Sequence, residues 1–339
     1  MKARDILDLE EKYYSPQSEV FYTPGENPER HLSWSDDSDV GEMVSFMDPK
    51  SNKFMSRKAT RFGDPQNLAS FFDEDDPQEA TEYIDTILQR LFDQELEEQQ
   101  SGCKTPKNIT PKMYSILLDW MVDVGIKFNL TSESYFEAAY IIKYCLGDQD
   151  FEDLKTTNLQ LLGVSALMIA SKNNERYTPE ARDYIYIADK SFTKEELLAM
   201  EQRILKSIQF HVNFVTPNQF INIFIRFLDI ASITKVRTMS FYLEEYIMID
   251  YSTLCSFLPS KIATGCIYLA CVSNGQIDFW NSNIANYSQM TEEDAKNVAQ
   301  DIYDFINAQT GPKGLLAAKR KYAQDTFYNI SSVPLIKPT

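Results

Sequence analysis

The chain has 339 residues, and at roughly 100 to 200 residues per domain this length predicts two domains. It carries 33 Lys and Arg residues against 50 Asp and Glu residues, and no apolar run reaches the roughly 18 to 20 residues that a membrane-spanning helix needs, so we expect no membrane contact. Its five cysteines form no CxxC pair and it has only two histidines, which disfavours a disulfide framework and a bound metal.

The acidic charge is concentrated in the first hundred residues. Residues 1–100 contain 10 basic and 24 acidic side chains, a net charge of −14, whereas residues 101–339 contain 23 and 26, a net charge of −3. A nearly neutral body lacks the basic face that neutralises phosphates, so we expect no direct nucleic-acid binding. Residues 1–79 are polar, dotted with Pro and Asp, and without sustained periodicity, which predicts a disordered acidic tail.

From about residue 80 the pattern becomes helical. Apolar residues recur at helical spacing, and we find no strand run or hairpin turn, so the predicted fold class is all-α. Capping residues mark where helices begin. Four threonines take this position, each followed by a proline or by an acceptor three residues later: Thr110 with Pro111, Thr193 with Glu196, Thr216 with Gln219, and Thr291 with Asp294.

The helical part of the chain repeats itself. Residues 193–208 and 291–306 match at a shift of 98, and the apolar segments 161–172 and 260–272 align at a shift of about 100. The pattern predicts two copies of one unit of about five helices. No charge occurs from residue 159 to residue 171, so this segment is the expected buried centre of the first copy.

Two charged residues break the apolar pattern of the first copy. Lys172 closes the charge-free helix, and Glu201 falls inside the apolar stripe of the helix at 193–208. They either form an internal ion pair or lie at the rim of the bundle and present a donor and an acceptor to a partner's backbone. The repeat places Val272 and Ala299 at the equivalent positions. A pair needed only to build the bundle should appear in both copies, and both interpretations stay open.

The helix predicted at 111–127 is apolar around more of its circumference than one core contact needs. Its main stripe holds Met113, Ile116, Leu117, Trp120, Met121 and Val124, while Leu118 and Val122 lie outside it. The helix is either buried on nearly all sides or exposes part of its surface as a binding patch. Periodicity alone favours burial.

The sequence offers no catalytic motif. It contains no Gly-rich phosphate loop, no nucleophile elbow and no metal-ligand cluster, and its acidic residues form no interpretable arrangement. We therefore expect a protein that is not an enzyme and that uses no cofactor.

Six segments, in order and at the right spacing, resemble mitotic cyclins of the A/B type. They are MYSILLDWMVDVG (113–125), LQLLGVSALMIASK (159–172), YTPEARDYIYIAD (177–189), SFTKEELLAMEQRIL (191–205), LPSKIATGCIYLA (258–270) and KYAQDTFYNIS (321–331). The resemblance implies two tandem five-helix cyclin boxes after a short leading helix. We expect a tail at 1–79, a first box with the leading helix at 80–212, and a second box at 213–339.

The same resemblance implies a function. Cyclins of this type are regulatory subunits that activate a cyclin-dependent protein serine/threonine kinase at G2 and mitosis and recruit its substrates, so we expect a nuclear and cytoplasmic protein. The alternative is a cyclin-fold scaffold that binds DNA or transcription factors. The nearly neutral body, the lack of a zinc ribbon, and the presence of Lys172 and Glu201 disfavour this alternative.

The resemblance also assigns roles to residues. Kinase contact falls on Lys172, Glu201, Phe210, Ile87, Ile169 and Leu205. A groove for short basic-hydrophobic docking motifs of substrates or inhibitors falls on Met113, Ile116, Leu117, Trp120, Asp123, Leu159 and Gln160. In the tail, Arg4 and Leu7 form an RxxL that resembles a destruction box read by a ubiquitin ligase.

Three residues depart from the family pattern. Tyr114 replaces an Arg that braces the first box internally, and Asn173 and Asn174 replace an aromatic residue and a Glu after Lys172. We expect a changed local geometry at the groove, and a kinase affinity or choice that differs from that of a typical family member.

Overall fold

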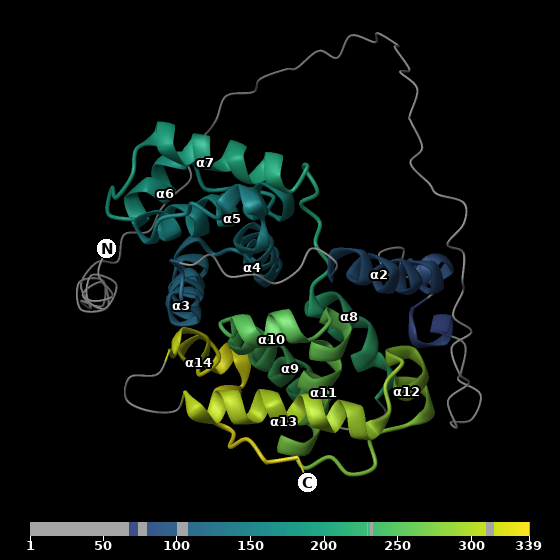
Figure 1. Cartoon of the computed structure of the whole chain (residues 1–339). Coiled ribbons are helices and arrows are strands. Elements are labelled where there is room, and N and C mark those ends of the chain that lie inside the picture. The colour runs from purple at the N-terminus through teal and green to yellow at the C-terminus, as the bar shows by residue number, and fades with distance from the viewer. Residues whose placement is uncertain are drawn as a thin grey trace, which may run out of the picture. The chain divides into compact units, whose positions relative to one another are not determined.

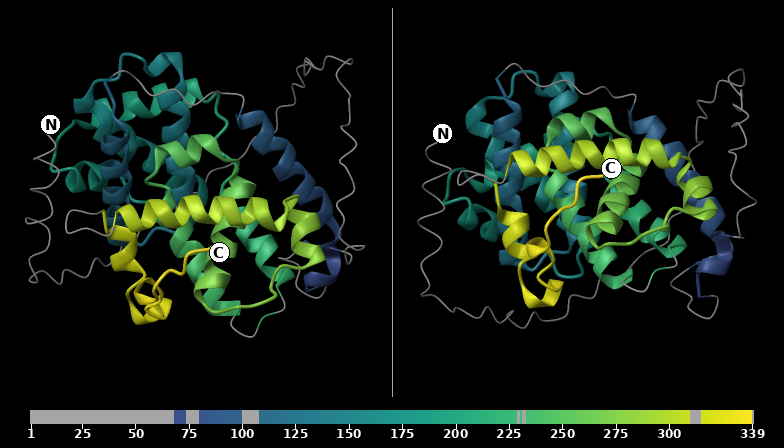
Figure 2. Two further views of the ribbon diagram at one scale, coloured as in Figure 1. Left: turned by 60° about the horizontal axis from the view of Figure 1, so that its bottom comes forward. Right: turned by 90° about the horizontal axis from the view of Figure 1, so that it is seen from below.

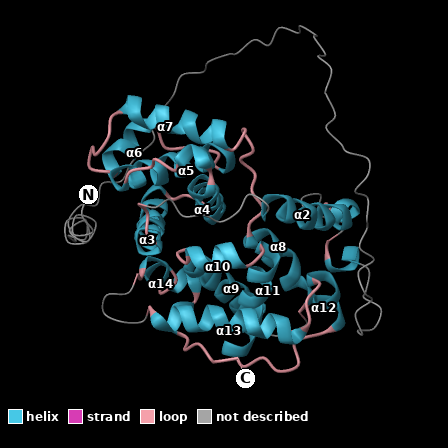
Figure 3. Cartoon of the chain, viewed as in Figure 1, coloured by secondary structure: helices cyan, strands magenta, loops and turns pink. Residues whose placement is uncertain are grey.

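The structure is a computed structural model, and it describes residues 68–73, 80–99, 108–228, 230, 233–309 and 315–338 (Figure 1). Helices and loops account for all of these residues, and no strand occurs among them (Figure 3). The all-α fold class is therefore confirmed. Arg4 and Leu7 lie outside the described residues.

The first copy of the repeat is a bundle around one buried helix. Its helices are α3 (Pro111–Phe128), α4 (Ser132–Gly147), α5 (Leu159–Asn174), α6 (Ala181–Ile187) and α7 (Lys194–Ser207). Helix α5 packs against the other four, and every residue from Leu159 to Ser171 except Gln160 is buried. The charge-free segment is the centre of this box, as its composition predicts.

The second copy has the same plan with two additional short helices. The five equivalent helices are α8 (Pro217–Phe224), α9 (Ile233–Ile247), α11 (Pro259–Ser273), α12 (Ser282–Ser288) and α13 (Glu292–Ala308). Helix α11 is central and packs against the other four. Helices α10 (Tyr251–Ser256) and α14 (Ala317–Lys321) are the additions, and the repeat alignment did not predict them. The tandem arrangement of two boxes is confirmed.

Capping side chains begin the helices where the sequence places them. The Thr110 hydroxyl accepts a hydrogen bond from the Met113 backbone N–H at 3.3 Å, with Pro111 at the first helical position. Thr193 and Thr291 each form a reciprocal capping box with the acidic residue three positions later. These bonds satisfy N–H groups that the helix itself leaves without a partner.

Close helix approach depends on one glycine in each box. A Cβ atom on Gly163 of α5 would lie 2.7 Å from the Leu117 side chain of α3, and one on Gly265 of α11 would lie 2.6 Å from the Val298 side chain of α13. Real Cβ atoms do not reach such distances, so a larger residue would push the helices apart. The central helix of each box therefore needs a glycine at the point of closest contact.

The leading helix α2 (Ile84–Gln99) packs on the second box (Figures 1 and 2). The Phe92 ring lies 5.2 Å from the Phe220 ring, measured between centroids, and the Glu95 carboxylate accepts hydrogen bonds from the backbone N–H and the hydroxyl of Ser260 at 2.9 and 2.7 Å. The buried face of α2 holds Ile84, Leu88, Phe92 and Glu95.

A short segment before α2 is also packed. Residues Leu68–Phe71 form a 3-10 helix, η1, in which Leu68 is fully buried and the Phe71 ring meets the Phe227 ring edge-on at 5.1 Å. The composition places these residues in the disordered tail. Their apolar contacts with the second box, which a local pattern does not reveal, explain the difference.

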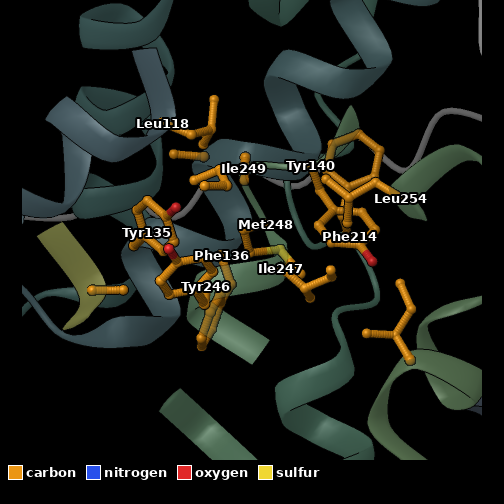
Figure 4. Close-up of a cluster of buried hydrophobic side chains, with 14 of the residues drawn as sticks. Leu118, Tyr135, Phe136, Tyr140, Phe214, Tyr246, Ile247, Met248, Ile249 and Leu254 are labelled. Carbon is orange, nitrogen blue, oxygen red and sulfur yellow. The ribbon is translucent and has the colours of Figure 1, made fainter. Parts of the chain in front are cut away.

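Apolar side chains from both boxes meet in one buried cluster (Figure 4). It combines Leu118, Tyr135, Phe136 and Tyr140 of the first box with Phe214, Tyr246, Ile247, Met248, Ile249 and Leu254 of the second. A hydrogen bond from the Ser115 hydroxyl to the Ile249 carbonyl, 2.7 Å long, links α3 to the end of α9.

The cysteines of the described residues are either buried thiols or disulfide-bonded. Cys145, Cys266 and Cys271 are buried free thiols, whereas Cys255 is disulfide-bonded, which the odd cysteine count did not indicate. Among the described helices, none combines the length and the apolar character needed to cross a bilayer. Within the same residues, no group of three or more His, Cys, Asp or Glu side chains could hold a metal ion.

Candidate functional site

Lys172 and Glu201 form an ion pair at the surface of the first box. Lys172 lies in the last turn of α5, and its ammonium donates to Glu201 Oε1 of α7 at 2.5 Å. The Lys172 side chain is 49% exposed and that of Glu201 is 15% exposed. The pair is therefore accessible to a partner. An ammonium has three donors, so the bond to Glu201 leaves donors for the carbonyl oxygens of another chain.

Exposed apolar side chains lie on the elements that carry the pair. The Phe210 side chain is 70% exposed, and its backbone φ of 60° is left-handed, as is that of Gln209 before it. Leu205 of α7 is half-buried. Leu198, one turn before Glu201, is also exposed, and the sequence analysis missed it because it lies off the apolar stripe of this helix.

Two other predicted kinase-contact residues lie in different surroundings. Ile87 is 38% exposed on α2, the helix that packs on the second box. Ile169 is buried in α5, one turn before Lys172 and Asn173, so its side chain presents almost no surface in the free chain.

The end of α5 is tied to neighbouring elements by two asparagines. The side-chain amides of Asn173 and Asn174 donate to Glu137 Oε2 of α4 at 2.9 and 2.8 Å, and Asn173 also donates to the Asn213 side-chain oxygen at 2.7 Å. Glu137 is buried, and burial raises the pKa of its carboxyl while the two amides lower it. The residues that depart from the family pattern thus bind within the chain.

The predicted docking residues divide into two groups. Met113, Ile116 and Trp120 are half-buried and lie on one face of α3, while Leu117 and Leu159 are buried. The expectation that Leu117 and Leu159 line an exposed groove does not match this placement. Leu117 packs onto Gly163 of α5, so it is part of the core.

The polar residues of the predicted groove either form hydrogen bonds within the chain or are buried. Asp123 accepts a hydrogen bond from Arg320 of α14 at 2.9 Å, and the nearby Asp119 accepts one from the Ala317 backbone N–H. Gln160 Oε1 is buried without a hydrogen-bond partner. Tyr114, which replaces the family's Arg, is buried against Tyr251 of α10 with ring centroids 5.0 Å apart.

A cavity of about 60 Å³ lies where α2 meets α4 and the start of α11. Glu95, Glu98, Tyr140 and Lys143 are among the residues that line it. Burial raises the pKa of Glu95 to about 7, against the lowering effect of its bonds from Ser260, and burial lowers the pKa of Lys143 to about 8. The cavity holds only a few water molecules by volume.

Two sequence families match the chain over the two boxes. Residues 86–213 match the family described as cyclin, N-terminal domain, and residues 215–335 match the cyclin, C-terminal domain. The chain belongs to the cyclin family. The resemblance seen in the sequence is confirmed, and the chain accordingly belongs to a class of non-catalytic regulatory subunits.

Curated relatives are named as cyclins of the A and B types. This cyclin is 29% identical over 279 residues to a G2/mitotic-specific cyclin-B of Dictyostelium discoideum, which covers 80% of this chain and 62% of the relative. It is 32% identical to putative cyclin-A3-1 of Arabidopsis thaliana, over 77% of this chain and 74% of the relative. The chain thus spans less than two thirds of the Dictyostelium protein.

A solved structure shows the same fold. A viral cyclin from herpesvirus saimiri superimposes with a TM-score of 0.55 at 17% identity, over 65% of this chain and 96% of that chain. At this identity the likeness concerns the fold alone.

Proposed function

We propose that this cyclin is the activating regulatory subunit of a cyclin-dependent protein serine/threonine kinase that acts at G2 and mitosis. The observation that carries the proposal is the exposed Lys172–Glu201 pair, flanked by the exposed side chains of Phe210 and Leu198. The name of the Dictyostelium relative, a G2/mitotic-specific cyclin-B, supports the stage of the cell cycle.

The surface around the pair has the composition of a protein interface. Burying a phenylalanine side chain contributes about 1.5 to 3 kcal/mol, and Phe210 leaves most of that contribution unused in the free chain. When a partner covers the charge pair beside this phenylalanine, the pair loses water and its donors and acceptors must be matched by the partner. This requirement fixes the orientation of the partner. The second box offers no such pair, since Val272 and Ala299 take its place.

The proposed mechanism is a shift of a conformational equilibrium. A kinase whose movable helix has an inactive and an active position is shifted towards the active one by a partner that binds this state better. The kinase then brings its own Lys–Glu pair and magnesium-binding Asp into place, and all phosphoryl chemistry stays on the kinase. The cyclin supplies a surface and no reacting group.

Recruitment of substrates belongs to the same proposal. Met113, Ile116 and Trp120 lie half-buried on one face of α3 and present apolar surface to a short basic-hydrophobic docking motif. Turnover through a ubiquitin ligase that reads Arg4 and Leu7, and residence in both nucleus and cytoplasm, complete the proposed role.

Reconstitution with purified kinases tests the proposal. The chain is mixed with each of a panel of inactive cyclin-dependent kinases, and both complex formation and phosphorylation of a short peptide are measured. We expect one kinase or more to bind and to gain at least tenfold in rate. Binding to none of them would contradict the proposal and favour the scaffold alternative.

A further inference from the structure

The proposed kinase-binding face is assembled from both boxes. Lys172 and Glu201 belong to the first box, whereas Ile87 lies on α2, which packs on the second box through Phe92 and Glu95. A partner that touches Ile87 and the ion pair together therefore contacts elements that belong to both boxes. Its affinity depends on how firmly α2 is held relative to α5 and α7.

Packing is incomplete where α2 passes the first box. The cavity of about 60 Å³ lies between Glu95 and Glu98 of α2 and Tyr140 and Lys143 of α4. The buried Tyr140 hydroxyl has no hydrogen-bond partner, and the Lys143 ammonium lies over the Tyr140 ring, 5.1 Å from its centroid. The four side chains form no hydrogen bond or ion pair between α2 and α4 among the described residues, so a polar link between α2 and the first box must lie at other residues.

Asn213 supplies such a link. Its backbone carbonyl accepts a hydrogen bond from Gln94 of α2 at 2.7 Å, and its side-chain oxygen accepts one from Asn173 of α5, also at 2.7 Å. Asn173 directly follows Lys172. Gln94 lies two helical turns after Ile87 on the same face of α2. One residue thus connects the two helices that carry the separate parts of the proposed interface.

Further hydrogen bonds hold the residues on both sides of the link. Asn173 also donates to the buried Glu137, which Asn174 binds as well. On the other side of the link, Glu98 of α2 accepts from the Val215 backbone N–H at 3.0 Å, two residues after Asn213. A network with several anchors holds its members in one arrangement before a ligand arrives.

We propose that Asn213, together with Asn173, is a positioning residue that fixes α2 relative to the Lys172–Glu201 pair and so preorganises the kinase-binding face. The expected effect on kinase affinity rests on the proposed function, whereas the link between α2 and α5 does not. Preorganisation raises affinity because fewer groups remain to be ordered on binding. It also gives Asn173, a departure from the family pattern, a role within the chain.

Alanine variants with a matched control test the proposal. Asn213→Ala and Asn173→Ala each break the link, whereas Asn174→Ala removes a bond to the same Glu137 without touching Asn213. We expect Asn213→Ala and Asn173→Ala to raise the Kd for the kinase about fivefold, because an ordinary hydrogen bond contributes about that factor to an equilibrium constant. The control should change the Kd less than twofold. The variant that combines Asn213→Ala with Asn173→Ala should bind the kinase no more weakly than either single variant, because both substitutions break the same bond.

A conservative variant and a distance measurement separate positioning from mere stability. Asn213→Asp keeps an oxygen that accepts from Asn173, so it should retain wild-type affinity. In the free chain, genetically encoded spin labels at the exposed Asp85 and Gln202 report the distance between α2 and α7. We expect Asn213→Ala to broaden this distance distribution and Asn174→Ala to leave it unchanged.

The outcomes are distinguishable. Equal weakening by Asn173→Ala and Asn174→Ala, or an unchanged distance distribution in Asn213→Ala, would overturn the positioning role, because the asparagines would then only satisfy Glu137. If the wild-type chain binds no kinase while Asn213→Ala broadens the distribution, the proposed function fails and the link between α2 and α5 stands.

Discussion

The two boxes share a plan and differ where a partner would bind. Both have a central helix with one closely packed glycine, and both begin their last long helix with a threonine capping box. The first box places Lys172 and Glu201 at its surface, while Val272 and Ala299 occupy these positions in the second. Features common to both copies build the bundle. Features of one copy point to function.

A second difference concerns the partners of buried acids, because Glu137 of the first box binds two asparagine side chains. Glu244 of α9 is fully buried and no side chain of the described residues donates to its carboxylate, while its neighbour Glu245 pairs with Lys321 at 2.6 Å. Burial raises the pKa of Glu244 well above its ordinary value. The second box thus carries a titratable group in its core, and its stability should depend on pH through that group.

Loss of the ion pair has the largest expected effect. Lys172→Ala combined with Glu201→Ala should weaken kinase binding and activation at least tenfold, because truncating charged groups at a buried interface costs about 2 to 5 kcal/mol. The pair lies at the surface, with Lys172 half exposed, so its loss should change the melting temperature little. Isothermal titration and a peptide kinase assay measure the two quantities.

A control variant sharpens this prediction. Arg203 of α7 pairs with Asp153 at 2.5 Å on the same box, and residues two apart, such as Arg203 and Leu205, do not share a helix face. Arg203→Ala with Asp153→Ala should leave kinase activation intact. If the two double variants lose activation equally, the Lys172–Glu201 pair has no special role.

Removal of η1 is expected to destabilise the second box. Deleting residues 1–67 should leave the melting temperature and kinase activation unchanged. Deleting residues 1–79 also removes the fully buried Leu68 and the Phe71–Phe227 contact, which should cost about 2 to 5 kcal/mol of unfolding free energy. Thermal denaturation of both deletions checks the difference. Equal melting temperatures would show that η1 adds no stability.

Glu244 gives a pH-dependent prediction. The unfolded chain ionises this carboxyl near its ordinary pKa of 4.5, while the folded chain keeps the proton to higher pH. Stability therefore falls as pH rises above 4.5, by up to about 1.4 kcal/mol per pH unit. Glu244→Gln removes this loss, so its advantage in melting temperature should grow from pH 5 to pH 8. An advantage that shrinks over this range would contradict the burial of a neutral acid.

The docking face has the smallest expected effect. Met113→Ala with Trp120→Ala should raise KM about fivefold for substrates that carry a basic-hydrophobic motif and leave kcat unchanged. The reason is that these apolar contacts bind the substrate equally strongly in its ground state and in the transition state. A short peptide without the motif serves as the control and should keep its rate. If both substrates lose rate together and the variant melts early, Met113 and Trp120 act as core residues.

Local chemistry determined what the sequence could predict. Thr193 with Glu196, and the charge-free stretch from 159 to 171, follow from hydrogen-bonding and burial rules that act over a few residues, and the structure confirms both. The repeat and the family motifs located Lys172 and Glu201. Their exposure and their contact required the structure.

Long-range contacts could not be predicted in this way. Asp123 meets Arg320 across 197 residues, and Asn173 meets Asn213 across 40, so no periodicity reveals either bond. The family resemblance assigns Leu117 to the docking groove. It is core because Gly163 of another helix comes close.

Hydrogen exchange of the chain with and without its bound kinase tests the central claim most directly, because it compares the two boxes in one measurement. The account predicts slower exchange at the last turn of α5, along α7, at residues 208–213 and in α2, with α11 and α13 unchanged. Protection confined to α11 and α13, or equal in both boxes, would contradict it.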